Sequence, residues 1–236
     1  VYVFTNAERV ELYKNDAYVT TLQKSPWRLL PHPPLCVEDT IGALLETQEH
    51  FEKPKADALR DCLLAAGKYG LAGMPLRKKL KMAWCMVRYK MKFEDGVALY
   101  GKYVGNWGGE ATRWRFDAKN GDALVGSVTL CPSEKLHLKV CASAETLAEG
   151  DTYDMAAIRV RILDENGNPA PYAQLPLQYT LEGPLSLVGP AVQTAEGGMG
   201  GTYLRTVGEG GRAKLTVSTP GCESVRLEFD VKKEMA

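Results

Sequence analysis

The chain has 236 residues, of which 45% are hydrophobic and 25% are charged, the composition of an ordinary globular protein. One small β-sandwich needs roughly 100 residues, so this length predicts two domains with additional material. The 29 basic and 29 acidic residues give a formal net charge of zero, which excludes the electrostatic signature of a nucleic-acid-binding protein and gives no reason to expect attraction to an anionic membrane.

The sequence carries no sign of a membrane span or a leader peptide. No run approaches the roughly 18 consecutive apolar residues of a transmembrane helix, and no basic segment followed by an apolar one opens the chain. Residue 1 is not Met, and Val1, Val3 and Phe4 already have the character of a strand. We therefore expect a piece of a longer polypeptide, for which secretion stays an open question.

Three short strands are predicted at the start of the chain, at residues 1–5, 8–14 and 18–23. In the second strand, apolar Val10 and Leu12 alternate with polar neighbours, as expected of a strand with one buried face. An Asn-Asp pair between the second and third strands predicts a tight turn and therefore a hairpin.

A proline-rich linker at residues 25–34, which contains Trp27 and His32, leads into a segment with helical periodicity. This segment, about residues 36–103, predicts three helices and a short fourth around residues 93–100. The third helix has the longest apolar stripe: Leu76, Leu80, Ala83, Trp84, Val87 and Met91. A basic run lies opposite this stripe and predicts a solvated helix face or, as the alternative, a docking surface for an acidic neighbouring domain.

Strand patterns resume after the helices, at residues 112–116, 124–129 and 136–140. We therefore predict a discontinuous first domain, residues 1–146, that consists of strands at about residues 1–24 and 110–146 with a helical insertion at about residues 36–103. A second β-sandwich, residues 147–236, opens with a strand in which isoleucine and valine alternate with arginine.

Four segments together resemble the C-terminal region of glycoside hydrolase family 2 β-galactosidases, which has immunoglobulin-like domains. They are VYVFTNAERVELYKND at residues 1–16, DENGNPAPYA at 164–173, LEGPLSLVGP at 181–190 and GGMGGTYLRT at 197–206. The resemblance implies a mainly β fold with two immunoglobulin-like β-sandwich domains, the first interrupted by the α-helical insertion. It also implies a non-catalytic accessory or scaffold region of a glycosidase.

The parent enzyme implied by this resemblance hydrolyses terminal β-galactosides by the retaining mechanism. Such an enzyme uses two carboxylates about 5 Å apart, held on the strand ends of a TIM barrel. The repeated alternation of strands and helices that a barrel requires is absent from this sequence. We therefore carry over no catalytic residue and expect this fragment by itself not to be an enzyme.

The candidate contact residues are aromatic and lie in the glycine-rich segment YGKYVGNWGGEATRW. They are Tyr100, Tyr103, Trp107 and Trp114. Flat aromatic rings can stack on the apolar face of a sugar. We expect the segment either to contact carbohydrate or to lie against another domain, and the simpler alternative is that Trp107 fills the junction between the helices and the sandwich.

No metal or cofactor site is predicted. Asp164, Asn166 and Asn168 have the alternate spacing of a calcium loop, but Pro169 stands where glycine is needed and Leu175 where the closing glutamate is needed. A tight turn is the better interpretation. The glycines of residues 197–201 are not followed by the lysine of a phosphate-binding loop, and they predict a bulge or a close-packed crossing.

The six cysteines show no close pairs and no regular spacing, which predicts reduced thiols and favours a reducing compartment, the bacterial cytoplasm. The partners implied by the resemblance are the catalytic barrel and other domains of the parent. Carbohydrate and a second copy of the chain stay open as partners, whereas nucleic acid and membrane are not expected. Two alternative functions are a carbohydrate-binding module and an adhesin-like surface domain.

Overall fold

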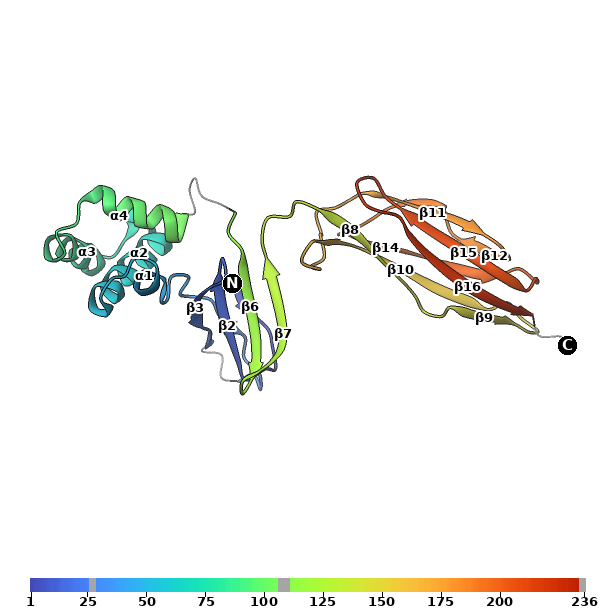
Figure 1. Ribbon diagram of the computed structural model, residues 1–236, viewed down its shortest axis with the longest axis horizontal. Helices are drawn as coiled ribbons and strands as arrows, with labels where there is room; N and C mark the ends of the chain where they lie inside the picture. The colour runs from blue at the N-terminus through green and yellow to red at the C-terminus, as the bar shows by residue number, and fades with distance from the viewer. Residues whose placement is uncertain (26–28, 106–110, 234–236) are drawn as a thin grey trace. The chain divides into compact units, whose positions relative to one another are not determined.

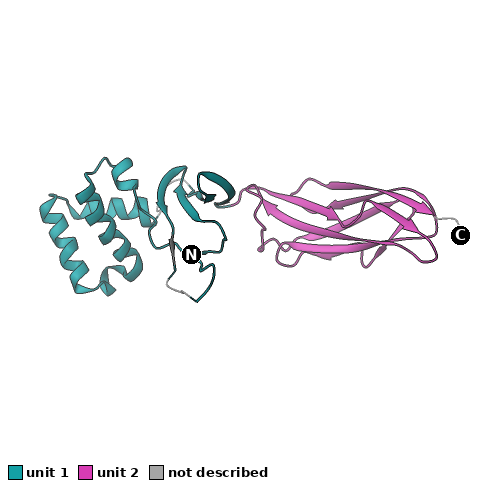
Figure 2. Cartoon of the chain, turned by 90° about the horizontal axis from the view of Figure 1, so that it is seen from below, with its two compact units in different colours: residues 1–132 teal, residues 133–236 magenta. Residues whose placement is uncertain are grey.

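The computed structural model of the chain describes residues 1–25, 29–105 and 111–233. The chain divides into two compact units, residues 1–132 and 133–236, which Figure 2 colours separately. Among the described residues, no helix combines the length and the apolar character that crossing a membrane requires.

The second unit is a β-sandwich whose sheets form two facing layers (Figures 1 and 2). One sheet has the order β12-β14-β10-β8 and consists of β8 (Leu136–Ala142), β10 (Met155–Asp164), β12 (Leu185–Val188) and β14 (Met199–Thr206). The other has the order β13-β11-β15-β16-β9 and consists of β9 (Thr146–Glu149), β11 (Pro176–Glu182), β13 (Val192–Thr194), β15 (Gly211–Ser218) and β16 (Val225–Lys233). Both sheets contribute side chains to one hydrophobic core.

Strand β10 shows why this sequence forms a sheet with one buried face. Ile158, Val160 and Ile162 are buried, whereas Arg159 and Arg161, which alternate with them, are exposed. Successive side chains of a strand point to opposite faces, so the period of two places every apolar residue in the core. The alternation predicted from the sequence is confirmed.

The turn after β10 is closed by the side chain of Asp164. Its Oδ1 atom accepts hydrogen bonds from the backbone N–H groups of Asn166 at 2.9 Å and Asn168 at 2.8 Å. Burial by itself raises the pKa of Asp164, but the hydrogen bonds from Asn168 and Asn166 outweigh it and hold this pKa below its usual value. The predicted turn is confirmed, and the carboxylate of Asp164 accepts hydrogen bonds from backbone N–H groups of this turn.

The glycine-rich start of β14 lies against neighbouring backbone. A Cβ atom on Gly201 would come within 2.4 Å of the carbonyl oxygen of Ile158 in β10, and one on Gly200 within 2.5 Å of Leu177 Cδ1 in the other sheet. Real Cβ atoms do not approach other atoms so closely, so a side chain at residue 201 would collide with backbone, whereas one at residue 200 would require Leu177 to move. The close-packed crossing predicted for this segment is confirmed.

The first unit contains two sheets and a helical block. The larger sheet has the order β3-β2-β6-β7 and consists of β2 (Arg9–Lys14), β3 (Ala17–Thr21), β6 (Trp114–Asn120) and β7 (Ala123–Leu130). The smaller has the order β1-β5-β4 and consists of β1 (Tyr2–Val3), β4 (Gln23–Lys24) and β5 (Leu35–Cys36). Between β2 and β3, Asn15 and Asp16 have positive φ angles of 47° and 63°, which these residue types tolerate in tight hairpin turns.

The helical block follows β5 in the sequence and precedes β6. It consists of α1 (Leu44–Thr47), α2 (Lys53–Gly73), α3 (Leu76–Arg88) and α4 (Phe93–Tyr100), followed by a π-helical segment, η1 (Gly101–Gly105). Pro54 lies in the first turn of α2, where a missing N–H costs nothing, and Gly70 breaks the helix with a φ of 67°. Strand β2, before the helices, pairs with β6 after them, and the inner face of this sheet shares one core with the helices.

The assignment of one strand differs from the sequence prediction. We expected residues 136–140 to belong to the first domain, but β8 pairs with β10 from Ala142 opposite Ile158 to Leu136 opposite Asp164. The division between the units accordingly falls between Pro132 and Ser133. Alternation of apolar and polar residues identifies a strand but carries no information about which distant strand it will pair with.

Most of the basic run of α3 is exposed, as expected of a solvated face, but Lys78 and Lys81 are half-buried. Lys78 and Lys81 both form ion pairs with Asp61 of α2, at 2.5 and 2.7 Å. Cys85, on the same side of α3, is buried. Because this side faces α2, the apolar stripe of α3 points outward.

Candidate functional site

A buried lysine joins the larger sheet of the first unit to the end of the helical block. Lys14, the last residue of β2, is only 7% exposed, and its Nζ atom donates hydrogen bonds to the carbonyl oxygens of Lys102 at 3.2 Å and Tyr103 at 3.3 Å. The ammonium group also lies 5.4 Å from the centre of the Trp114 ring. Burial lowers the pKa of Lys14, and the nearby charge of Lys102 lowers it further.

Tyr103 forms the second part of this junction. Its hydroxyl group donates a hydrogen bond to Glu49 Oε1 at 2.6 Å, and the same carboxylate pairs with Lys102 at 2.6 Å. Burial, together with the hydrogen bond to Glu49, raises the pKa of Tyr103 to about 12. Glu49 follows α1 and Tyr103 lies in η1, so this cluster connects the two ends of the helical block.

This junction predicts a specific loss of stability at high pH. The pKa of Tyr103 is higher in the folded than in the unfolded chain, so its contribution to stability is complete below pH 10 and is lost as the pH rises towards about 12. We expect Tyr103→Phe to reduce this loss, measured as the free energy of unfolding of the first unit by urea titration at pH 9 and pH 11. Since all 4 tryptophans of the chain lie in the first unit, at positions 27, 84, 107 and 114, tryptophan fluorescence follows it selectively.

The contribution of Lys14 to stability changes with pH in the opposite direction to that of Tyr103. The folded-state pKa of this cation is lowered, so its contribution increases with pH up to the unfolded value of 10.5 and then stays constant. A Tyr103→Phe variant with the same decline between pH 9 and pH 11 as the parent chain would show that the tyrosine is not responsible.

The aromatic residues predicted as a contact surface lie at this junction, where the structure describes them. Tyr103 is buried, and Tyr100 and Trp114 are half-buried against the core that the helices and the sheet share. Trp107 lies outside the described residues. The three described rings pack against the core of the first unit, and their contact with carbohydrate or with another domain stays a prediction.

Sequence reasoning missed Lys14 and Glu49. The signal for Lys14 was present, because the period of two in β2 places Lys14 on the same face as Val10 and Leu12, which are both buried. A lysine at an inward position needs a partner, and the structure supplies backbone carbonyls. Glu49 carried no comparable signal, because it lies in the loop between α1 and α2.

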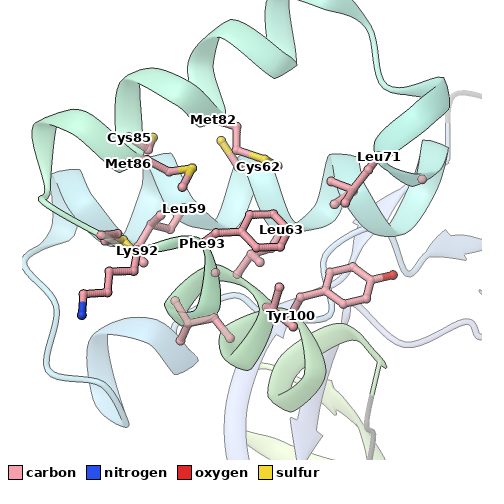
Figure 3. A pocket seen from close by; sticks show the side chains of 16 residues that line it. Leu59, Cys62, Leu63, Leu71, Met82, Cys85, Met86, Lys92, Phe93 and Tyr100 are labelled. Atoms are coloured by element: carbon pink, nitrogen blue, oxygen red, sulfur yellow. The ribbon is translucent and has the colours of Figure 1, made fainter.

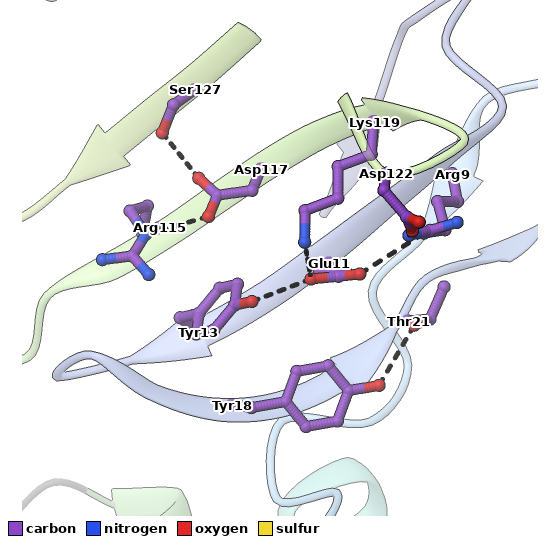
Figure 4. A network of polar contacts seen from close by, with 10 residues as sticks. All are labelled: Arg9, Glu11, Tyr13, Tyr18, Thr21, Arg115, Asp117, Lys119, Asp122 and Ser127. Carbon is purple, nitrogen blue, oxygen red and sulfur yellow. Dashed lines mark hydrogen bonds and ion pairs between the residues drawn. The ribbon is translucent and has the colours of Figure 1, made fainter. Parts of the chain in front are cut away.

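The outer face of the same sheet carries a network of charged side chains centred on Glu11 (Figure 4). Glu11 accepts hydrogen bonds from Lys119 Nζ at 2.6 Å, from the Tyr13 hydroxyl at 2.8 Å and from Arg9 Nε at 3.3 Å. The hydrogen bonds from Lys119 and Tyr13 lower the pKa of Glu11. A carboxylate held ionised in this way is a poor general acid at neutral pH.

A second carboxylate of this face, Asp117 of β6, is also bound by neighbours (Figure 4). It accepts hydrogen bonds from the Ser127 hydroxyl at 2.7 Å and from Arg115 Nε at 3.2 Å. The guanidinium group of Arg115 also lies 4.4 Å from the centre of the Tyr13 ring. The network links β2, β6 and β7 side by side and explains how a charged sheet face is stabilised.

An apolar pocket of about 340 Å³ lies among α2, α3 and α4 (Figure 3). Its lining includes Cys62 and Leu63 from α2, Met82 and Met86 from α3, and Tyr100 from α4. Burial raises the pKa of Cys62 to about 12, with a further contribution from the neighbouring Cys85. The thiol therefore stays protonated, which is the opposite of what a catalytic cysteine needs.

Within residues 1–25, 29–105 and 111–233, no group of three or more histidine, cysteine, aspartate or glutamate residues is arranged to hold a metal ion.

The sequence of the second unit matches a known domain family. Residues 138–228, which form most of that unit, match the profile of the glycoside hydrolase family 2 C-terminal domain 5. The second unit is therefore similar to a C-terminal domain of family 2 proteins. The resemblance seen in the sequence is confirmed, and this portion of family 2 proteins is non-catalytic.

Two curated relatives of this chain are both named beta-galactosidase. The protein from Thermoanaerobacter pseudethanolicus is 34% identical over 93 residues, which are 39% of this chain and 12% of that protein. The protein from Rhizobium radiobacter is 29% identical over 94 residues, which are 40% of this chain and 67% of that protein. The aligned part is thus a small fraction of the first relative.

Solved structures of glycosidases are similar to this chain in fold. A β-glycosidase from Bacteroides vulgatus superposes with a TM-score of 0.52 at 15% identity, covering 96% of this chain and 22% of that one. A β-glucuronidase of glycoside hydrolase family 2 superposes with a TM-score of 0.52 at 17% identity, covering 100% of this chain and 18% of that one. At this identity the comparison shows the fold alone, and the mainly β architecture is confirmed.

Proposed function

We propose that the whole protein is a glycosidase that hydrolyses terminal β-galactosides with retention, and that this chain is its C-terminal scaffold. The observation that carries the proposal is the family 2 match over residues 138–228, together with two relatives named beta-galactosidase. The two catalytic carboxylates would belong to a barrel outside these residues. A β-glucuronide is the competing substrate, because one of the matching structures is a β-glucuronidase.

The scaffold role is supported by how the first unit is built. Lys14 of β2 donates a buried hydrogen bond to the carbonyl oxygen of Tyr103, and the Tyr103 hydroxyl donates to Glu49, so the sheet is tied to both ends of the helical block. We propose that Tyr100 and Trp114 serve this internal contact rather than sugar binding. A rigid block of this kind is suited to covering or positioning a catalytic domain.

We also propose that the protein works in a reducing compartment, the cytoplasm. All six cysteines lie among the described residues and each is a thiol there, with Cys62 and Cys85 buried in neighbouring helices. Thiols without disulfides are typical of cytoplasmic proteins.

Activity measurements on a panel of nitrophenyl glycosides test the proposed function. We expect the longer polypeptide to hydrolyse the β-galactoside and this chain alone to be inert, because the carboxylates of the described sheet face are already bound by cations. Proton NMR of the first product anomer tests retention. Hydrolysis of any glycoside by this chain alone contradicts the non-catalytic assignment, and a preference of the longer polypeptide for the β-glucuronide contradicts the proposed substrate.

A further inference from the structure

Helix α3 is held with its apolar side towards the solvent. Lys78 and Lys81 reach across to the two oxygens of Asp61 in α2, at 2.5 and 2.7 Å, and Cys85 is buried beneath them. These contacts lie on one side of α3 and fix the rotation of the helix about its own axis. Turning α3 to bury its apolar side would break both ion pairs and expose the thiol.

The outward side carries one continuous row of large apolar side chains. They keep between 53% and 81% of their surface exposed, and we call them the α3 row: Leu76, Leu80, Trp84 and Val87. Spacings of four, four and three residues align them along a single side of the helix. Single exposed apolar residues are common on protein surfaces, but a row of four large ones on one helix indicates a surface that is covered in the intact protein.

The charged residues of α3 itself are all basic. Residues 67–92 contain eight basic residues and no aspartate or glutamate: Lys68, Arg77, Lys78, Lys79, Lys81, Arg88, Lys90 and Lys92. Asp61 neutralises part of this charge through Lys78 and Lys81. On α3 itself, Arg77 and Arg88 flank Trp84 on one side of the row, and Lys79 lies on the other side.

The basic residues beside the α3 row determine which kind of surface can cover it. A symmetric contact between two copies of the row would bring two basic rims together, which like-charge repulsion disfavours. The row needs an apolar surface edged by carboxylates. This chain covers only 22% of the length of the matching β-glycosidase, so a family 2 protein holds further domains on the same polypeptide at high effective concentration.

We infer that the α3 row docks onto an apolar, carboxylate-edged surface of another domain of the same polypeptide, outside these 236 residues. The inference rests on the proposed scaffold function and assigns that function to a particular helix face. The apolar row supplies the contact area, and Arg77, Lys79 and Arg88 form ion pairs around its edge.

Hydroxyl-radical footprinting with mass spectrometry tests the docking, because it reports the solvent exposure of individual side chains. We expect Trp84 to be oxidised rapidly in this chain alone and severalfold more slowly in the longer polypeptide. Trp114, which is already half-buried in the first unit, is the internal reference and should react similarly in both. Equal oxidation of Trp84 in the two proteins overturns the inference.

Charge-reversing and apolar-to-charged variants provide a second test of the docking. In the longer polypeptide, Leu80→Glu with Val87→Glu is expected to lower the melting temperature, while the same pair in this chain alone leaves it nearly unchanged because these side chains are 62% and 81% exposed. Arg77→Glu with Arg88→Glu should restore rapid oxidation of Trp84 in the longer polypeptide. Tyr172→Glu, at an exposed position of the second unit, is the matched control. It should neither lower the melting temperature of the longer polypeptide nor restore rapid oxidation of Trp84.

Two other outcomes would assign the row to a different occupant and overturn the inference. One is a dimer of this chain, seen by analytical ultracentrifugation, that Leu80→Glu abolishes. The other is co-sedimentation of this chain with phosphatidylglycerol vesicles, but not phosphatidylcholine vesicles, that Trp84→Glu abolishes. Glycosidase activity in a polypeptide with an unprotected Trp84 refutes the docking alone, whereas protection without glycosidase activity refutes the proposed function alone.

Discussion

Replacing Leu204 with alanine is expected to lower the free energy of unfolding of the second unit by about 2–5 kcal/mol. Leu204 lies in β14 and is 0% exposed, within the core formed by both sheets of the sandwich. Its two neighbours in the four-stranded sheet, β10 and β12, prevent the strand from moving to fill the space that the substitution leaves. The loss therefore combines the missing apolar contacts with the cost of a cavity.

Urea denaturation followed by far-UV circular dichroism measures this change. The matched control is Tyr203→Ala, one residue earlier in the same strand, because Tyr203 is 53% exposed and leaves no cavity in the core. Tryptophan fluorescence should report an unchanged transition in both variants, since the second unit contains no tryptophan. Equal destabilisation by the two substitutions would contradict the packing described for this sandwich.

Replacing Gly198 with alanine is the second substitution with a large expected effect. Gly198 has a φ of +73°, and a Cβ atom there would lie 2.3 Å from the carbonyl oxygen of Ala170. The left-handed backbone costs roughly 1–2 kcal/mol for a residue with a Cβ atom, and the forced separation of packed segments adds about 1–3 kcal/mol. We expect the total loss in the free energy of unfolding to be about 2–5 kcal/mol.

The adjacent glycine separates the two contributions. Gly197 also has a positive φ, of +59°, but a Cβ atom there would meet nothing within 4 Å. Gly197→Ala should therefore show only the backbone cost, about 1–2 kcal/mol. If urea titration gives the same loss for both variants, the close approach of residue 198 to Ala170 is not what makes glycine necessary.

Much of the second unit could be predicted from its sequence because its signals are local. The alternation in β10 sets which face is buried, and Asp164 with the residues after it forms a turn through hydrogen bonds within five residues of chain. The order of the motifs from DENGNPAPYA to GGMGGTYLRT was sufficient to indicate the family that the profile match then identified. Each of these features depends on residue type and short spacing alone.

The pairing of strands could not be predicted in the same way. The pattern of residues 136–140 identified a strand correctly, yet only the structure shows that it pairs with β10 rather than with the strands that precede it. Strand pairing is a choice among distant partners, and the free energy that decides it comes from a whole sheet and its core.

The candidate site likewise combines features that the sequence determines with features that only the tertiary structure decides. The sequence by itself determined which residues are apolar, charged or aromatic and how they repeat along α3 and β2. Tertiary structure decided that Lys14 is buried under backbone carbonyls, that Tyr103 donates to Glu49, and that Asp61 holds α3 with its apolar row outward. The physical reason is that an amphipathic helix has a preferred face but no fixed partner, and the ion pairs of Lys78 and Lys81 with one half-buried carboxylate, Asp61, together with the buried Cys85, set the rotation of α3.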